Sequence, residues 1–216
     1  MVMGAEANAV VWKEDFFPEY LIPDILELII NTWVIFPKPK PLDPEVPISE
    51  AFTKKLRAEK NQRDDLPFKI RPELVTLNTG DDTDGRIDIC FDFIGTPYEE
   101  IYFAFECKRL RIPYPDRLDT NNSDYVNEQG MMCFITGKYS RSVTNGGMIA
   151  YVMDGNTNKA IDSVGKLIKR KSLVLKLTKD TGLESSSMLI SYPNVRETTH
   201  TLSKRNFTIH HIFLAV

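Results

Sequence analysis

The stretch Ile101-Tyr102-Phe103-Ala104-Phe105-Glu106-Cys107-Lys108 decides how the rest of the chain is interpreted. A β-strand turns successive side chains to opposite faces. The apolar residues at 101, 103 and 105 therefore share one face with Cys107, while Glu106 and Lys108 lie on the other. At a rise of about 3.3 Å per residue, the Cα atoms of Glu106 and Lys108 are about 6.6 Å apart. The stretch predicts a buried strand that carries an acid and a base side by side.

A second apolar run, residues 86–94, precedes this strand and is joined to it by the turn residues Gly95-Thr96-Pro97. Alternation puts Asp88 on the face opposite to that of Ile87 and Ile89. If the two runs pair as a hairpin, Asp88 comes beside Glu106. Two carboxylates that meet at one point are the ligands that Mg²⁺ and Mn²⁺ prefer, and the backbone carbonyl of Cys107 is a further candidate ligand.

Regular elements are predicted on both sides of this hairpin. The spacing of apolar residues and the capping signals predict four helices, over residues 24–35, 49–63, 123–139 and 157–171. Further strands are predicted over 68–77, 148–153, 173–177, 188–192 and 209–216. Five prolines between positions 37 and 47 predict an extended tether without regular structure. This order favours an α/β fold, in which helices flank a mixed central sheet.

Asp88, followed 18 positions later by Glu106-Cys107-Lys108, resembles the motif of the PD-(D/E)XK nuclease superfamily, although Ile87 stands where the name of the motif has proline. The order of predicted elements over residues 49–171 is also similar to the core of that family. The resemblance implies one restriction-endonuclease-like domain over residues 1–216. Residues 1–48, a helix with a Pro-rich extension, and residues 172–216, the C-terminal strands, are then additions to the core.

The resemblance also implies roles for individual residues. Asp88 and Glu106 would bind Mg²⁺ or Mn²⁺ together with the carbonyl of Cys107, and Lys108 would be the catalytic lysine. Members of the family add a carboxylate from the helix before the meander, which we match to Glu50. The auxiliary candidates on the following helix are Tyr125 and Gln129.

Basic residues near the motif are candidates for contacts with nucleic-acid phosphates. These residues are Arg109, Arg111, Lys138 and Arg141. An equally good interpretation is that they are ordinary solvated charges. The same two interpretations apply to the basic helix over residues 157–171, with solvation slightly favoured.

Composition limits the classes of protein that the chain can belong to. It has 42% hydrophobic and 26% charged residues, which is typical of a folded globular domain. Its longest apolar stretch, residues 25–36, is shorter than the roughly 20 residues that a bilayer requires, and the N-terminus lacks the features of a secretory signal. Three widely spaced cysteines predict buried, reduced thiols and a cytoplasmic location. A net charge of −3 argues against binding nucleic acid by bulk charge alone.

The resemblance to the PD-(D/E)XK superfamily implies a Mg²⁺-dependent endonuclease that hydrolyses DNA, with RNA as the less favoured substrate, in restriction or host defence. A homodimer is expected by analogy, because cleavage of a duplex needs two sites. The alternative is a non-catalytic or partner-dependent subunit that binds nucleic acid within a multi-protein antiviral complex and keeps the nuclease fold. For the three charged residues alone, a surface ion-pair ladder is the simpler interpretation, but their apolar neighbours disfavour it.

Overall fold

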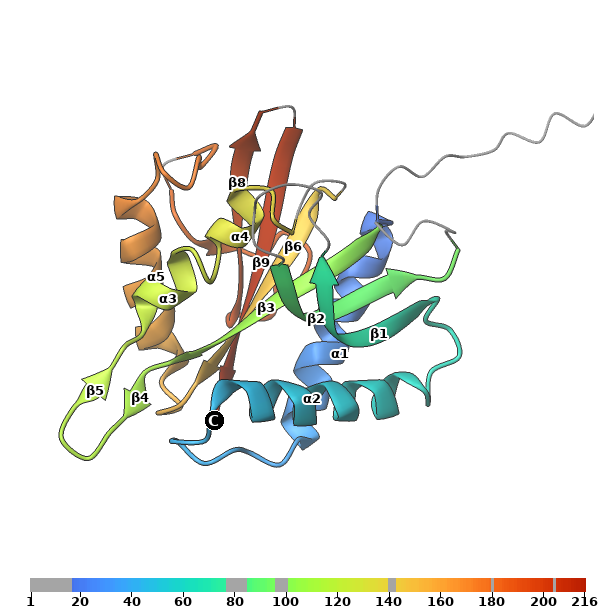
Figure 1. Ribbon diagram of the computed structural model, residues 1–216, viewed down its shortest axis with the longest axis horizontal. Helices are drawn as coiled ribbons and strands as arrows, with labels where there is room; N and C mark the ends of the chain where they lie inside the picture. Colours follow the sequence, from blue (N-terminus) through green and yellow to red (C-terminus); the bar gives the residue numbers. More distant parts are fainter. Residues whose placement is uncertain (1–16, 77–84, 96–100, 140–142, 180, 204) are drawn as a thin grey trace, which may run out of the picture.

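The computed structural model describes residues 17–76, 85–95, 101–139, 143–179, 181–203 and 205–216, which form a seven-stranded sheet with helices on both faces (Figure 1). The strands, in chain order, are β1 (Phe68–Thr76), β2 (Gly85–Phe93), β3 (Tyr102–Leu110), β6 (Asn145–Val152), β7 (Glu184–Ser185), β8 (Val195–Leu202) and β9 (Arg205–Ala215). A separate two-stranded ladder joins β4 (Ile112–Pro113) to β5 (Leu118–Asp119). The α/β class with a mixed sheet is as predicted.

The helices are η1 (Glu19–Leu21), α1 (Ile22–Ile35), α2 (Glu45–Lys60), α3 (Asn122–Val126), α4 (Met132–Ile135) and α5 (Thr157–Arg170). Their apolar residues pack on the two faces of the sheet and form two cores. α1 and α2 cover one face, and α3, α4 and α5 cover the other (Figure 1). β3 serves both cores, because Phe103, Phe105 and Cys107 enter the first and Ala104 and Leu110 enter the second.

The strand order is β1-β2-β3-β6-β9-β8-β7, with parallel pairing of β3 with β6 and of β6 with β9 and antiparallel pairing elsewhere. Every residue of β6 is buried, as expected for a strand covered by helices on both faces. β9, which comes from residues 172–216, pairs with β6 and β8 and therefore lies inside the sheet. α1 is also integral, since Trp33 Nε1 donates to the carbonyl of Ala215 at 2.7 Å.

The prediction that the proline-rich segment has no regular structure up to position 47 is wrong for its last three residues. α2 begins at Glu45, four residues before the predicted start, and Pro47 lies in its first turn. Proline is tolerated there because the first N–H groups of a helix have no partner within the helix. Glu45 is therefore the first residue of a helix, whereas the sequence predicted that it lies in the extended tether.

Three other predicted elements differ from the structure. The helix over 123–139 is two short helices, α3 and α4, separated at Gly130, where an added Cβ would lie 2.1 Å from the carbonyl oxygen of Tyr125. Residues 173–177 and 188–192 are turns with an isolated bridge at Leu177 rather than strands. The polar strand β8 was not predicted.

The cysteines are free and buried, as predicted. Among the described residues, no helix combines the length and the apolar character needed to cross a membrane. The acidic run at residues 80–85, which joins the strands predicted over 68–77 and 86–94, lies almost wholly outside the described residues.

Candidate active site

The candidate site forms where β2 and β3 part. Their antiparallel ladder runs from Asp92 opposite Tyr102 to Ile89 opposite Phe105. One residue further along the same register, Asp88 stands opposite Glu106. Here the carboxylate of Asp88 takes the place of a strand partner, because its Oδ2 accepts the N–H of Cys107 at 2.7 Å. The hairpin thus brings Asp88 next to the strand that carries Glu106 and Lys108.

Beyond this point, side chains bind the edge of β3 that faces away from β6. The N–H of Arg109 donates to Glu45 Oε2 at 2.8 Å, and the carbonyl of Arg109 accepts from Asn121 Nδ2 at 3.0 Å. The carbonyl of Cys107 accepts from Lys108 Nζ at 3.0 Å. Backbone groups at a sheet edge need partners when they are buried, and here carboxylate, amide and ammonium groups supply them. We call this segment, residues 107–109, the open edge of β3.

The ammonium of Lys108 lies among three oxygen atoms. Besides the carbonyl of Cys107, it donates to Glu106 Oε1 at 2.7 Å and to Glu45 Oε1 at 3.2 Å. Burial alone would lower the pKa of Lys108, but the carboxylates of Glu106 and Glu45 outweigh it and raise the pKa above its ordinary value. Lys108 therefore stays charged at neutral pH.

Glu106 is buried and only half satisfied. Its Oε1 accepts from Lys108, while its Oε2 is buried without a hydrogen-bond partner among the described residues. Burial, followed by the negative charge of Asp88, raises the pKa of Glu106, and Lys108 offsets this only in part. A buried acceptor without a partner lowers the stability of a folded protein. A cation or a hydrogen-bond donor next to this oxygen would remove that cost.

The hydrogen bonds at the open edge bring four charged groups together. These are three carboxyl groups (Asp88, Glu106 and Glu45) and one ammonium (Lys108), and among these four described groups the formal charges sum to −2 when all are ionised. The oxygen donors and the unpartnered Glu106 Oε2 fit Mg²⁺ or Mn²⁺, with Asp88, Glu106 and the carbonyl of Cys107 as its holders. In the described part of the chain, however, no group of three or more His, Cys, Asp or Glu side chains is already gathered as a metal site.

The structure brings Glu45 to the site and leaves Glu50 away from it. Glu50 is exposed on α2, and no hydrogen bond or ion pair among the described residues joins it to the open edge. Glu45, the first residue of α2, contacts both Lys108 and Arg109. The match to Glu50 assumed a helix start at Ser49, which is wrong. Acidic residues favour the first turn of a helix, and this signal, read together with Pro44 and Pro47, could have pointed to Glu45.

The arginines after the motif have protein partners. A guanidinium nitrogen of Arg109 donates to the carbonyl of Asp43 at 2.9 Å, which fixes the loop before α2. Arg111 is buried, has a φ of 55°, and its guanidinium binds both carboxylate oxygens of Asp154 at 2.7–3.0 Å. These contacts favour a structural role for Arg111 over phosphate binding. Lys138 is half-buried with its ammonium 5.9 Å from the ring centre of Tyr139, and Arg141 lies outside the described residues.

No hydrogen bond or ion pair among the described residues joins the auxiliary candidates, Tyr125 and Gln129, to the site. Gln129 is exposed. Tyr125 is fully buried, and its hydroxyl lies 2.9 Å from His211 Nδ1 on β9, across the sheet from β3. The contacts continue from His211 Nε2 to Thr198 Oγ1 at 2.9 Å, from Thr198 Oγ1 to His200 Nε2 at 2.7 Å, and from His200 Nδ1 to the carbonyl of Leu175 at 2.7 Å. We call this buried series the histidine chain.

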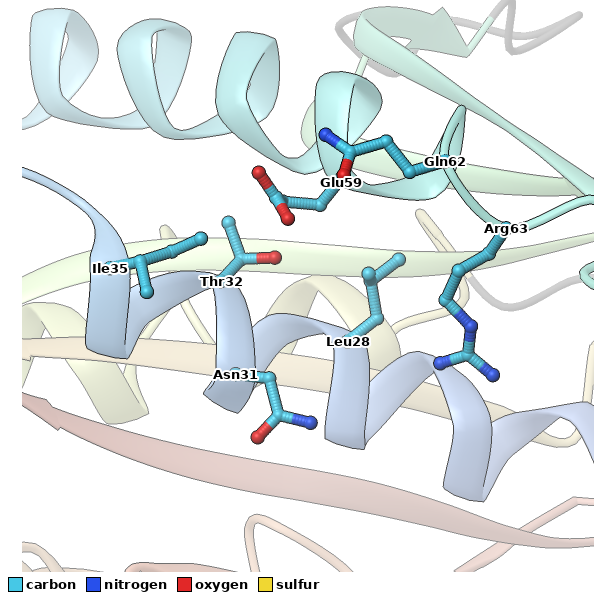
Figure 2. Close-up of a pocket in the computed structure, with 7 residues that line it drawn as sticks. All are labelled: Leu28, Asn31, Thr32, Ile35, Glu59, Gln62 and Arg63. Carbon is cyan, nitrogen blue, oxygen red and sulfur yellow. The ribbon is translucent and has the colours of Figure 1, made fainter.

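A separate cavity of about 430 Å³ lies between α1 and the C-terminal end of α2, and Figure 2 shows the residues that line it. Its charged lining residues are already paired, Glu59 with Lys55 and Arg63 with Asp65. Glu45 lies at the opposite end of α2, and a helix of 16 residues is about 24 Å long. The cavity is therefore not part of the candidate site.

Comparison of the chain with family models, with curated proteins and with solved structures gives no significant match.

Proposed function

We propose that the chain is a divalent-metal-dependent endonuclease with a restriction-endonuclease-like fold that cuts DNA in preference to RNA. One observation carries the proposal: Asp88, Glu106 and Lys108 come together at the buried open edge of β3, with an excess of negative charge. Charges are seldom buried in this number without a function, because their desolvation is costly. The resemblance to the PD-(D/E)XK superfamily supplies the substrate class and the setting in restriction or host defence.

The chain's own groups suit phosphodiester hydrolysis. Asp88 and Glu106, with the carbonyl of Cys107, would hold Mg²⁺ or Mn²⁺, which when bound polarises a phosphoryl oxygen and lowers the pKa of a bound water. The ammonium of Lys108 can stabilise the negative charge that develops on the phosphate. The hydrogen bond from the N–H of Cys107 fixes the carboxylate of Asp88 in place.

Cleavage of supercoiled plasmid, measured with and without Mg²⁺, tests the proposal. The wild-type protein is expected to cut only with Mg²⁺. Lys108→Met and Glu106→Gln are each expected to slow cleavage by about 100-fold or more, because each removes a group that acts on the transition state. Cleavage by Lys108→Met or Glu106→Gln at the wild-type rate would contradict the assignment.

Two carboxylates of α2 provide a matched pair for the same assay. Glu45→Gln removes a contact with Lys108, whereas Glu50→Gln changes an exposed carboxylate five residues further along the helix. We expect Glu45→Gln to slow cleavage and Glu50→Gln to leave it within about twofold, as for a surface substitution. An equal loss in both variants would show that the contact of Glu45 is not used.

A second candidate function is a nucleic-acid-binding subunit that does not cut. One observation favours it: the ammonium of Lys108 already bonds to Glu106 and to the carbonyl of Cys107, two of the groups a cation would need. Binding of DNA by the purified wild-type protein, measured by fluorescence anisotropy, together with no cleavage in Mg²⁺ or Mn²⁺, would favour this candidate.

A further inference from the structure

The open edge of β3 already contains a cation, which is the side chain of Lys108. Its ammonium donates to Glu106 Oε1 at 2.7 Å, to the carbonyl of Cys107 at 3.0 Å and to Glu45 Oε1 at 3.2 Å. It therefore lies between two carboxylates and against a backbone carbonyl, all of them hard oxygen donors. A divalent cation seeks the same kind of donor.

The site is nevertheless not saturated by this ammonium. The second oxygen of Glu106 is buried without a partner among the described residues, and the side chain of Glu106 is only 8% exposed. Among the four described charged groups at this edge, one ammonium also faces three carboxyl groups. A single ammonium thus neutralises the site in part, and a further or stronger cation is electrostatically favoured.

We propose that Lys108 is the resident counter-ion of the open edge and that a divalent cation binds there by competing with its ammonium for the same oxygen atoms. This inference rests on the proposed function, because that function supplies the divalent cation. Lys108 then has two states. In the metal-free protein its ammonium bridges Glu106 and Glu45, and in the metal-bound protein the ammonium is released from Glu106.

Competition has a measurable consequence for metal affinity. A divalent cation that displaces the ammonium must break the charge-assisted hydrogen bonds of that ammonium. Breaking a single bond of this kind weakens the affinity for the cation by about a factor of ten or more. Removal of the ammonium should therefore strengthen metal binding. If Lys108 instead took no part in metal binding, its removal would act only through the change in net charge.

Titration calorimetry of Mn²⁺ into the full chain tests the inference with two variants. Lys108→Met removes the competing ammonium and is expected to bind Mn²⁺ at least about tenfold more tightly than the wild type. Arg109→Met is the matched control, because it removes one positive charge from the next residue, whose guanidinium bonds to the carbonyl of Asp43 rather than to a carboxylate of the site. Its affinity is expected to change by less than about threefold.

Equal or weaker binding by Lys108→Met, or an equal gain in Arg109→Met, overturns the competition while leaving the metal site itself in place. Absence of Mn²⁺ binding in the wild type and in both variants overturns the proposed function as well. NMR of the Lys108 side-chain ¹⁵Nζ in the wild type gives a readout that needs no variant to fold. Its resonance should shift on saturation with Mg²⁺, and an unchanged resonance overturns the inference.

Discussion

The open edge of β3 and the histidine chain are both buried polar regions of one sheet, and they differ in how completely their groups are satisfied. In the histidine chain, each polar side-chain atom has a partner, and the partners fix the protons. His200 Nδ1 must donate to the carbonyl of Leu175, so His200 Nε2 accepts from the hydroxyl of Thr198. Thr198 Oγ1 then accepts from His211 Nε2, and His211 Nδ1 accepts from the hydroxyl of Tyr125.

The open edge has no such closed arrangement. Within the part of the chain that the structure describes, it keeps an acceptor without a partner, Glu106 Oε2, and more carboxyl groups than the one ammonium of Lys108 can neutralise. A satisfied buried network stabilises a fold, whereas a buried group with an unmet requirement costs stability and is kept for another reason. The comparison teaches that substitutions should change stability with opposite signs in the two regions.

The largest effect on stability is expected from Thr198→Val. The substitution keeps the shape of the side chain but leaves the facing nitrogens of His200 and His211 buried without partners. We expect the free energy of unfolding to fall by about 2–5 kcal/mol, measured by urea denaturation. The control is Thr201→Val on the same strand, whose exposed hydroxyl contacts Thr178 and whose loss should cost less than about 0.5 kcal/mol. Similar losses in both variants would contradict the closed chain.

An intermediate effect is expected from pH. Burial lowers the pKa of His200 and of His210 to about 4. Below the ordinary histidine pKa of 6.5 the unfolded chain takes up protons that the folded chain does not, so the free energy of unfolding falls as the pH drops from about 6.5 toward 4. The loss should reach about 1–2 kcal/mol per histidine at about pH 5.

The variant His200→Asn isolates one of these groups, because asparagine does not titrate and can still donate to the carbonyl of Leu175. Denaturation between about pH 7 and pH 5 should give a shallower dependence for this variant than for the wild type, by up to about 1.4 kcal/mol per pH unit. Identical slopes would mean that His200 does not resist protonation in the folded state.

The smallest effect, and the one of opposite sign, is expected from Glu106→Gln in metal-free protein. Because the pKa of Glu106 is raised in the folded state, its ionisation makes the free energy of unfolding fall as the pH rises above about 4.5. Lys108 keeps Glu45 and the carbonyl of Cys107 as partners after the substitution. We expect a gain in the free energy of unfolding of at least about 1 kcal/mol at pH 8, and this gain should disappear near pH 5. Glu59→Gln, in a surface pair with Lys55, is the control, and a loss of stability specific to Glu106→Gln would refute the comparison.

The sequence was informative where local alternation decides structure. The period of two over residues 86–94 and 100–108 predicted both strands of the hairpin, and with them the position of Asp88 beside Glu106. The same reasoning failed for β8, because Val195–Leu202 is rich in threonine and charge and lacks an apolar face long enough to be noticed. Its place in the sheet comes from pairing with β9 and from the buried Thr198 and His200, which depend on tertiary contacts.

The sequence was sufficient to predict which charged residues lie near the site, but it did not predict which residues contact them. Spacing along β3 put Glu106 and Lys108 on one face, but the contact of Glu45 depends on where α2 begins and on where β2 leaves β3. Neither is a property of a short stretch of sequence. Likewise, the contact of Tyr125 with His211 depends on how α3 packs on the sheet, and no periodicity in residues 123–139 contains that information.

The carboxylates at the open edge of β3 also act as a cover against self-association. Asp88 and Glu45 occupy the N–H groups of Cys107 and Arg109, which would otherwise present two free amides to any extended segment of another molecule. An alanine at position 88 or 45 leaves one of these N–H groups without its acceptor. If such a variant were inactive, loss of catalysis could not be distinguished from aggregation. Asparagine and glutamine keep an acceptor oxygen for these amides, and they are therefore the substitutions that separate catalysis from solubility.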